Sequence, residues 1–374
     1  MKFTCTKENL LRGLQLVGGV ATKPSNLPIL SHILIKAQDS GVALVSTNLE
    51  IAVTASVRAK VDKTGAFTVP AKTVVDFVSL LGEELVTVEL EGQEVHIRGE
   101  RSKTKIKGMP AEEYPVIPEV EQQHSYSISV DHFRDALSRV VFSAAKNDIR
   151  PELSGVYFGF FSNGNKGLVT AATDSYRLAE SKVSVDQGDD EAACIVPART
   201  VYEFVRLLST AKEEQEKLVR LSVTENQIAL RYDSLEVTSR LVDGQYPDYT
   251  QIIPAKFQTT LVAPIDLVQT MIKAASLFTT TGVNAVSFNI DAEEKTLKIS
   301  SISTQTGEHE SVLDSIEVIG ETNNILLNHR YVLDGLQHMV SGEVELKMNS
   351  PEAPCVFKQK ESDDYLYIVM PIRQ

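Results

Sequence analysis

The chain has no tryptophan, only three cysteines, and no long uninterrupted apolar run among its 374 residues. Cys5, Cys194 and Cys355 lie far apart without paired spacing, which favours reduced thiols over a disulfide framework. No N-terminal signal is visible and no segment is apolar enough to span a membrane. We therefore expect a cytoplasmic protein that is neither secreted nor inserted in a membrane.

Residues that metal sites and catalytic centres need are also not grouped. The seven histidines form no His-Glu-x-x-His pair, and there is no Cys-x-x-Cys motif. Segment 159–166 resembles a phosphate loop only faintly, because Asn165 stands where the lysine is needed; a hairpin turn fits it better. The acidic run 186–191 lacks the spacing of a calcium loop and reads as a solvated turn. We expect no metal, no cofactor and no enzymatic activity.

The composition suits several ordinary soluble domains. Hydrophobic residues make up 43% and charged residues 23% of the chain, which is enough material for three cores. The formal net charge is −13. Adhesive binding to nucleic acid phosphates would favour a basic chain.

What the sequence does contain is one pattern repeated three times. Segment 67–81 recurs as 194–208 and, more faintly, as 325–339. The apolar columns have the i, i+1, i+4, i+7 spacing of one helical face: Val74/Val201/Val332, Val75/Tyr202/Leu333, Val78/Val205/Leu336 and Leu81/Leu208/Met339. One further column is basic (Lys72, Arg199, Arg330), and the column four residues later is acidic (Asp76, Glu203, Asp334). Each copy therefore carries the same amphipathic helix.

A second helix is expected to open each block. It begins near Thr6, Ser129 and Ala263, of which Thr6 and Ser129 suit an N-cap, while Pro264 suits a first helical position. Its matching apolar columns are Leu10/Phe133/Leu267 and Leu14/Leu137/Met271.

Short segments rich in β-branched residues between the helices predict strands at 33–37, 42–46, 86–90, 95–98, 155–161, 168–171, 218–223, 228–232, 285–290, 297–300, 344–347 and 365–370. Each block is thus an α+β unit of two helices against antiparallel sheet. Two segments with Tyr-Pro, 109–118 and 242–254, join the blocks and are expected to run extended. The predicted domains are 1–120, 121–254 and 255–374.

Six segments in order carry a resemblance to a known family: Met1-Lys-Phe-Thr, 26–30, the repeated helices, 172–179, 241–249 and 369–373. Together they resemble the bacterial DNA sliding clamp, the β subunit of DNA polymerase III, over the whole chain. The resemblance implies three repeated DNA-clamp domains and a ring-shaped, head-to-tail homodimer with helices lining its hole. It implies a processivity factor for DNA replication without catalysis. The ring would encircle duplex DNA independently of sequence, while the replicative polymerase, the clamp loader and other proteins with a clamp-binding motif bind to it.

A ring needs only a locally basic lining, which is compatible with the negative net charge. The candidate lining residues are Lys72, Arg139, Arg199, Arg206, Lys273 and Arg330, and Lys23 and Asn147 match pore loops of the family. The alternative is that these are ordinary solvated helix residues, some paired with the acid four positions on. Pro151 and Glu152 stand where the best-known pattern has aromatic residues.

The resemblance also implies a pocket for short peptide motifs between the second and third domains. Its matching positions are Leu153, Thr173, Tyr176, Arg177, Leu178, Pro247, Ile252, Ile368, Met370, Pro371 and Ile372. An aliphatic pocket with a few polar groups suits Leu or Phe anchors, and flexible Met370 suits several clients. The alternative is that these side chains are domain core. Tyr176 and Gln251 depart from the family pattern, which has histidine and arginine there.

Dimer closure would join domain one of one chain to domain three of the other. The matching residues are basic on one side (Arg101, Lys103, Lys105) and acidic on the other (Glu308, Glu310), with Leu277 and Phe278 as apolar contacts. Thr104 occupies a position that is often aromatic in the family.

Two other classes of protein remain open. An enzyme would need titratable side chains that converge, and segment 173–177, the densest polar motif, has no histidine or second carboxylate beside it. In a repeat scaffold that does not bind DNA, the pocket would remain but the basic helix column would be incidental.

Overall fold

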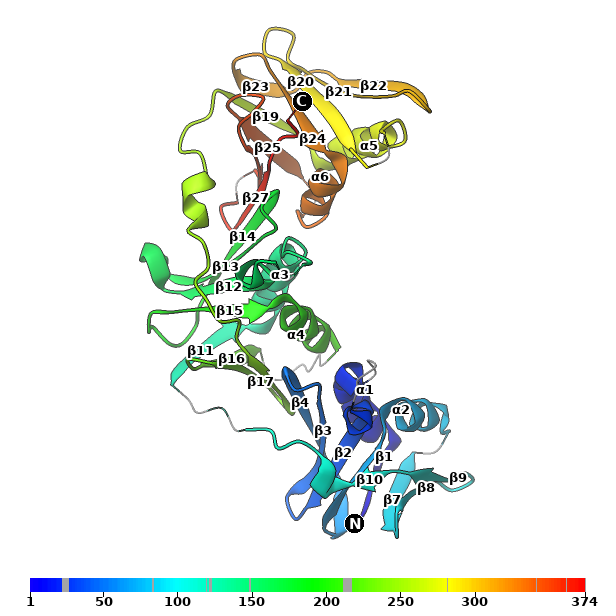
Figure 1. Cartoon of the computed structure of the whole chain (residues 1–374). Coiled ribbons are helices and arrows are strands. Elements are labelled where there is room, and N and C mark those ends of the chain that lie inside the picture. The colour runs from blue at the N-terminus through cyan, green and yellow to red at the C-terminus, as the bar shows by residue number, and fades with distance from the viewer. Residues whose placement is uncertain are drawn as a thin grey trace. The chain divides into compact units, whose positions relative to one another are not determined.

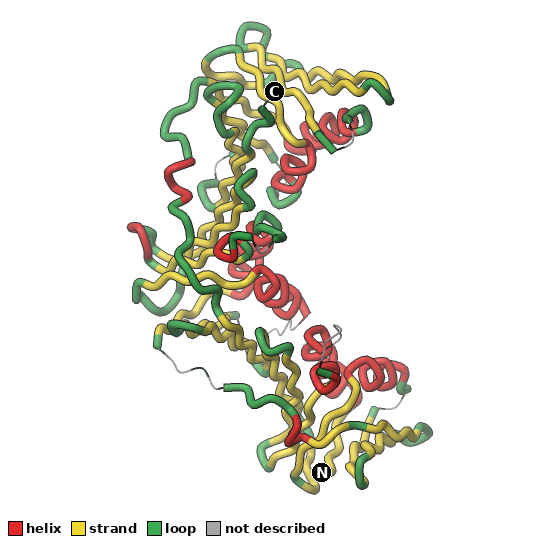
Figure 2. The backbone as a smooth tube through the Cα atoms, viewed as in Figure 1, coloured by secondary structure: helices red, strands yellow, loops and turns green. Residues whose placement is uncertain are grey.

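The computed structural model describes residues 1–21, 27–82, 84–118, 120, 123–147, 149–210, 217–280, 282–340, 342–360 and 362–373 (Figure 1). By its internal packing the chain divides into two compact units. The first comprises Met1–Arg134, Val185–Asp190 and Glu203–Leu241, and the second comprises Asp135–Ser184, Glu191–Tyr202 and Val242–Gln374. Strands, yellow in Figure 2, account for more of each unit than helices do.

The first unit contains two antiparallel sheets. The five-stranded sheet has the order β5 (Lys60–Lys63), β1 (Lys2–Thr6), β7 (Leu85–Glu91), β8 (Glu94–Arg98) and β9 (Lys103–Lys107). The nine-stranded sheet has the order β10 (Met109–Pro110), β6 (Gly65–Pro70), β2 (His32–Gln38), β3 (Gly41–Thr47), β4 (Ile51–Val57), β18 (Leu235–Arg240), β17 (Gln227–Tyr232), β16 (Leu218–Val223) and β11 (His124–Ser129).

The second unit also contains two antiparallel sheets. A nine-stranded sheet has the order β15 (Ala192–Pro197), β12 (Gly155–Phe160), β13 (Gly167–Thr173), β14 (Arg177–Ser184), β27 (Tyr365–Val369), β26 (Cys355–Gln359), β25 (Glu343–Met348), β19 (Thr259–Pro264) and β23 (Glu317–Gly320). A four-stranded sheet has the order β22 (Gly307–Leu313), β21 (Thr296–Ser303), β20 (Ala285–Asp291) and β24 (Asn323–Asn328).

Each repeat of the described chain carries two α-helices: α1 (Lys7–Ala21) and α2 (Ala71–Leu80), α3 (Val130–Val141) and α4 (Ala198–Thr210), and α5 (Ile265–Ser276) and α6 (His329–Leu336). In every repeat a strand leads into each of the two helices. The predicted α+β unit of two helices and antiparallel strands is therefore confirmed, and so are the predicted strands. In the parts that the structure covers, no helix has both the length and the apolar character to cross a membrane.

The buried helix faces follow most of the predicted columns, although Val75, Val205 and Leu333 are only half-buried. Val74, Val201 and Val332 are at most 1% exposed, as predicted, but Tyr202 is 52% exposed because its column lies at the border of the apolar stripe. In the opening helices Leu267 is 47% exposed and Val268 takes its place in the core. The predicted column was one residue out of register there, because α5 begins at Ile265 with Pro264 as its cap and not as its first residue.

The same shift separates two of the candidate lining residues. Arg139 lies one position further along α3 than Lys273 lies along α5, so the two are not at matching positions. The expected cap at the first helix is present, since the Asn9 amide donates to Thr6 Oγ1 over 3.2 Å.

Both nine-stranded sheets run across the predicted domain boundaries. β4 pairs with β18 in the first unit, and β14 pairs with β27 in the second. Main-chain hydrogen bonds thus join one part of the second repeat to the first repeat and the other part to the third. The second repeat is therefore divided between the two compact units. The boundaries near 120 and 254 stay a prediction.

The segments that join the repeats are packed and not simply extended. After β10 the chain forms a short 3-10 turn, η2 (Ala111–Glu113), and Tyr114, 5% exposed, enters an apolar cluster with Leu30, Leu34 and Val45. In the second such segment η5 (Tyr249–Ile252) places Tyr249, 9% exposed, in another cluster. The first joining segment therefore packs against the repeat that precedes it, whereas the second packs against strands of both repeats that it joins.

Three histidines in the packed interior make stability depend on pH. Burial lowers the pKa of His32, His329 and His338 below the ordinary 6.5, although Asp334 partly opposes the shift at His338. The unfolded chain then binds more protons, so stability is complete above pH 6.5 and is lost as pH falls through that value. Urea unfolding followed by circular dichroism should give a lower free energy at pH 5.5 than at pH 7.5.

A variant with all three histidines replaced by glutamine should show a smaller difference between the two pH values, whatever its absolute stability. An equally large difference in that variant would assign the effect to other groups.

Candidate functional site

The loop between β13 and β14 is fixed by its own side chains. Thr173 Oγ1 donates to the Arg177 carbonyl over 2.6 Å and accepts from the Ser175 amide over 3.1 Å. Asp174 Oδ1 accepts from the Tyr176 and Arg177 amides over 3.0 and 3.1 Å. These bonds stabilise the left-handed conformation of Ser175, whose φ is 75°. A short polar sequence thus sets the loop shape locally.

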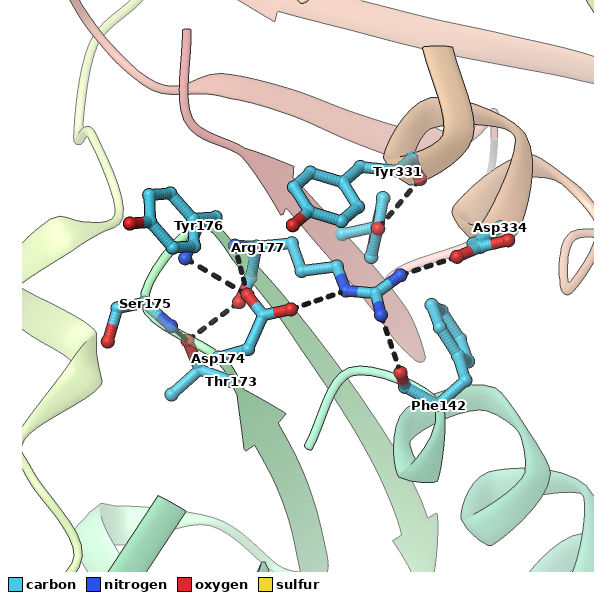
Figure 3. A network of polar contacts seen from close by, with 9 residues as sticks. Phe142, Thr173, Asp174, Ser175, Tyr176, Arg177, Tyr331 and Asp334 are labelled. Carbon is cyan, nitrogen blue, oxygen red and sulfur yellow. Dashed lines mark hydrogen bonds and ion pairs between the residues drawn. The ribbon is translucent and has the colours of Figure 1, made fainter. Parts of the chain in front are cut away.

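Arg177, at the start of β14, is the centre of a polar network (Figure 3). Its guanidinium donates to Asp174 Oδ2 over 3.0 Å, to Asp334 Oδ2 of α6 over 2.6 Å and to the Phe142 carbonyl over 2.9 Å. The same group lies over the rings of Phe142 and Tyr331, at 5.4 and 4.7 Å from their centroids. The side chain is only 6% exposed. Arg177 therefore ties the loop, the end of α3 and α6 together.

Electrostatics keep this buried cation charged. Burial works to lower the pKa of Arg177, but Tyr367 and the carboxylates of Asp334 and Asp174 outweigh it and leave the pKa above its ordinary value. Each of the three guanidinium nitrogens has an acceptor within the protein. Arg177 positions the loop and is not a free cation in a cleft.

Beside this network lies a cavity of about 230 Å³. Its lining includes eight of the predicted peptide-binding residues: Leu153, Thr173, Arg177, Leu178, Pro247, Ile252, Ile368 and Met370. Four further residues line it: Arg150, Ser175, Asp248 and Tyr249. Leu178 and Ile368 are 0% exposed and form part of the core cluster, while Ile252 is 41% exposed at the mouth. The cavity is mainly aliphatic with polar groups at its rim.

One wall of this cavity is formed by the joining segment 242–254, which is held in place by hydrogen bonds and ring contacts. Tyr249 OH donates to Glu180 Oε2 over 2.7 Å, and burial followed by the Glu180 charge raises the pKa of Tyr249. Asp248 caps η5 by accepting from the Thr250 amide over 3.2 Å. The ring of Tyr249 packs edge-on against those of Tyr157 and Tyr246.

Three of the predicted peptide-binding residues do not line this cavity. Tyr176, 64% exposed, lines an adjoining hollow of about 450 Å³ that also includes Asn147 and Tyr331. Pro371 and Ile372 lie beyond β27, and the Ile372 amide donates to the Leu326 carbonyl of β24 over 2.8 Å. The chain end is tied down by this bond.

The candidate lining residues differ in their exposure and in their contacts. Lys72, Arg199, Lys273 and Arg330 are exposed on α2, α4, α5 and α6. Arg139 is half-buried, with its guanidinium 5.9 Å from the Tyr365 ring centroid. Arg206 is bonded to Glu203 and donates to the Leu16 carbonyl over 2.7 Å, so it is already engaged within the first unit. Lys23 lies outside the described residues.

The candidate dimer residues lie on two edge strands. Lys103 and Lys105 are exposed on β9, the edge of the five-stranded sheet, and Arg101 lies two residues before this strand begins. Glu308 and Glu310 are exposed on β22, the edge of the four-stranded sheet. Leu277 is 71% exposed after α5, and the Phe278 ring stacks on that of His309 with centroids 5.6 Å apart.

Among the residues that can be placed, no group of three or more His, Cys, Asp and Glu side chains could hold a metal ion. Sequence reasoning missed Arg150, Ser175, Asp248 and Tyr249 as lining residues. Ser175 and Asp248-Tyr249 lie inside two of the six segments that carry the resemblance, 172–179 and 241–249, so the sequence indicated their neighbourhood. For Arg150 the sequence holds no signal.

Comparison with known proteins covers the whole chain. Three family models match in order: the N-terminal domain of the DNA polymerase III beta subunit at residues 1–118, its central domain at 127–248 and its C-terminal domain at 250–373. Two relatives named "Beta sliding clamp", from Haemophilus influenzae and Escherichia coli, are 28% and 29% identical over 375 residues, with all of both chains covered.

A solved structure, the DNA polymerase sliding clamp from Bacillus subtilis, superposes with a TM-score of 0.93 at 26% identity, covering 100% of this chain and 99% of that one. The three predicted clamp repeats are thus confirmed by sequence and by structure. The chain belongs to the family of DNA polymerase III beta subunits, the bacterial sliding clamps.

Proposed function

We propose that the chain is a processivity factor of DNA replication that acts as a head-to-tail homodimer closed around duplex DNA. It tethers the replicative polymerase and other motif-bearing proteins through the cavity of the second unit. The domains are bounded near residues 120 and 254. The protein acts in the cytoplasm and catalyses no reaction itself, so a separate complex opens the ring.

The observation that carries this proposal is a rule of strand pairing. At the first junction β4, the third strand of the β2–β4 meander, pairs with β18, the last strand of the following repeat. At the second junction β14 pairs with β27, again a third strand with a last strand. In the third repeat the strand equivalent to β4 and β14 is β22, and its outer edge is unpaired among the described strands. In the first repeat the strand equivalent to β18 and β27 is β9, and its outer edge is likewise unpaired. A second copy of the chain supplies each of these missing partners.

The two open edges are complementary in charge. β9 presents Lys103 and Lys105, and β22 presents Glu308 and Glu310. An exposed edge strand offers unpaired main-chain groups to another chain. Complementary charge then selects the register and disfavours pairing of like edges. Leu277 and Phe278 near β22 add apolar surface to this contact.

The aliphatic cavity supports binding of short peptides. Its floor, made by Leu178 and Ile368, is buried, and its mouth at Ile252 is open. Arg177 keeps the loop in place, while Met370 offers an adaptable contact. An extended peptide with a Leu or Phe anchor fits such a site.

A closed ring reconciles DNA binding with the net charge of −13. Lys72, Arg199, Lys273 and Arg330 supply local positive charge, whereas strong attraction over the whole surface would impede sliding. Binding that depends on closure is topological and survives salt, in contrast to phosphate contacts, which lose about 10³- to 10⁵-fold in affinity between 50 and 200 mM salt when six to ten contacts are made.

Retention on nicked circular DNA tests this function. A clamp loader loads the protein onto the circular DNA, the complex is washed in high salt, and the amount of bound protein is followed while the circle is cut. We expect retention through the wash and release upon cutting. Loss in the wash alone would contradict encirclement.

The basic column is tested in the same assay. Lys72→Glu, Arg199→Glu and Arg330→Glu together should reduce loading severalfold, since like charges then face the phosphates. The matched control reverses three exposed lysines that lie outside the helices: Lys36→Glu, Lys166→Glu and Lys256→Glu. Equal loading of the two variants would remove the helix column from the interface.

A further inference from the structure

The first unit also has a cavity, of about 310 Å³, at the junction between β4 and β18. Its walls are the β3–β4 loop, the joining segment 115–118 and the end of β18. The cavity of the second unit has the same three walls: the β13–β14 loop, the joining segment and the end of β27. The two cavities occupy equivalent places in consecutive repeats.

The loops that form the two cavities have the same construction. Thr47 Oγ1 donates to the Ile51 carbonyl over 2.9 Å and accepts from the Leu49 amide over 3.0 Å. Asn48 Oδ1 accepts from the Glu50 and Ile51 amides over 3.0 and 2.8 Å. Thr173 and Asp174 make the same four bonds in the other loop. Leu49 has a φ of 75°, the same value as Ser175.

The joining segment is fixed to this loop as a wall. Tyr114 OH accepts from the Thr47 amide over 3.1 Å and donates to the His32 carbonyl over 3.4 Å. Burial, opposed by the bond from Thr47, raises the pKa of Tyr114 to about 12. The cavity is therefore preformed, which reduces the ordering cost of binding.

Apolar side chains lie exposed at the mouth of this cavity. Val116 is 93% exposed and Leu49 49% exposed, and Leu49 is held outward in a left-handed conformation that a leucine rarely adopts. Ile51 stands at the position of Arg177, so an aliphatic side chain takes the place of the buried arginine in the lining of this cavity.

The charges at the rim are those of Glu50 and Arg240. Glu50 has a partner of its own. Arg240 is exposed, and across the described residues its guanidinium makes no hydrogen bond or ion pair. An unpaired arginine beside an apolar cavity is complementary to a carboxylate next to an aliphatic side chain.

We propose that the cavity lined by Leu49, Ile51, Val116, Ile117 and Arg240 is a second docking groove for short extended peptides. It takes an aliphatic anchor in the cavity and pairs Arg240 with an adjacent carboxylate of the peptide. This goes beyond the proposed tethering role and requires neither DNA nor ring closure. One chain would then engage two motif-bearing segments, one in each unit.

The test uses the full chain with methyl-labelled isoleucine and alanine, and the probe is the capped peptide acetyl-Leu-Leu-Asp-amide. Ile252→Asp blocks the cavity of the second unit. In this background we expect the methyl signals of Ile51, Ala52 and Ile117 to shift saturably. Val116→Asp should weaken this binding by about tenfold or more. Leu80→Asp, which changes a residue 84% exposed outside the cavity, is the matched control and should leave the binding unchanged.

The partner chemistry is tested by reversing one charge at a time. Arg240→Glu should weaken binding of the aspartate peptide and favour the same peptide with lysine in place of aspartate. Equal preference of both proteins for both peptides would overturn the pairing with Arg240. Absence of saturable shifts at Ile51, Ala52 and Ile117 in the blocked protein would overturn the groove itself.

Discussion

Replacing Arg177 by alanine is expected to lower the free energy of unfolding by about 3 kcal/mol, because it leaves buried partners of a charged network without their cation. Asp174 is 17% exposed and would lose its ion pair, and the Phe142 carbonyl would lose its donor. The α6 contact through Asp334 would be lost in the same step. Urea unfolding followed by far-ultraviolet circular dichroism measures the change, since the chain has no tryptophan for fluorescence.

Two controls locate the origin of that loss. Arg177→Lys keeps the charge but cannot donate in a fork to three acceptors, so it should recover only part of the stability. Asp334→Asn should cost less than Arg177→Ala because Asp334 is 44% exposed. An alanine variant as stable as the parent would contradict the assigned role of the network.

Reversing the charge of one open edge is expected to dissociate the dimer. Lys103→Glu with Lys105→Glu places acidic residues opposite Glu308 and Glu310 at both junctions between copies. Like charges across an interface cost several kcal/mol, which corresponds to a dissociation constant raised by about 10² or more. Sedimentation velocity over a range of protein concentrations gives this constant.

The complementary reversal provides the decisive control. A chain that carries Glu308→Lys and Glu310→Lys as well has opposite charges facing again and should recover the dimer. If it stays monomeric while folded, the two edges do not meet. If the first variant remains dimeric, the proposed pairing of β9 with β22 is wrong.

The local elements could be predicted because each is encoded by neighbouring residues. The spacing of Val74 and Val78 specifies the inner face of α2, and runs of β-branched residues specify the strands. Where two adjacent positions are both apolar, as at Leu267 and Val268, the sequence does not say which one faces the core. That choice depends on where the helix begins.

Other features could not be predicted because their partners are distant. Arg177 and Asp334 are separated by 157 positions, and no local pattern pairs them. The pairing of β4 with β18 likewise joins strands from different repeats. The polar turn at Thr173 could be recognised in the sequence as a motif. The turn at Thr47 has only the threonine in common with it, and the two turns are recognised as equivalent only by their hydrogen bonds.

The pairing of strands at the junctions between repeats also bears on assembly. A contact in which one edge meets a different edge of the next copy can repeat indefinitely, and it ends only if the accumulated rotation brings the last edge back to the first. Two chains of three repeats close only if each junction turns by about one sixth of a full rotation. The twist between β4 and β18, and between β14 and β27, therefore decides between a closed ring and an open filament. Substitutions that alter this angle would change the form of the assembly without touching the surface where two copies meet.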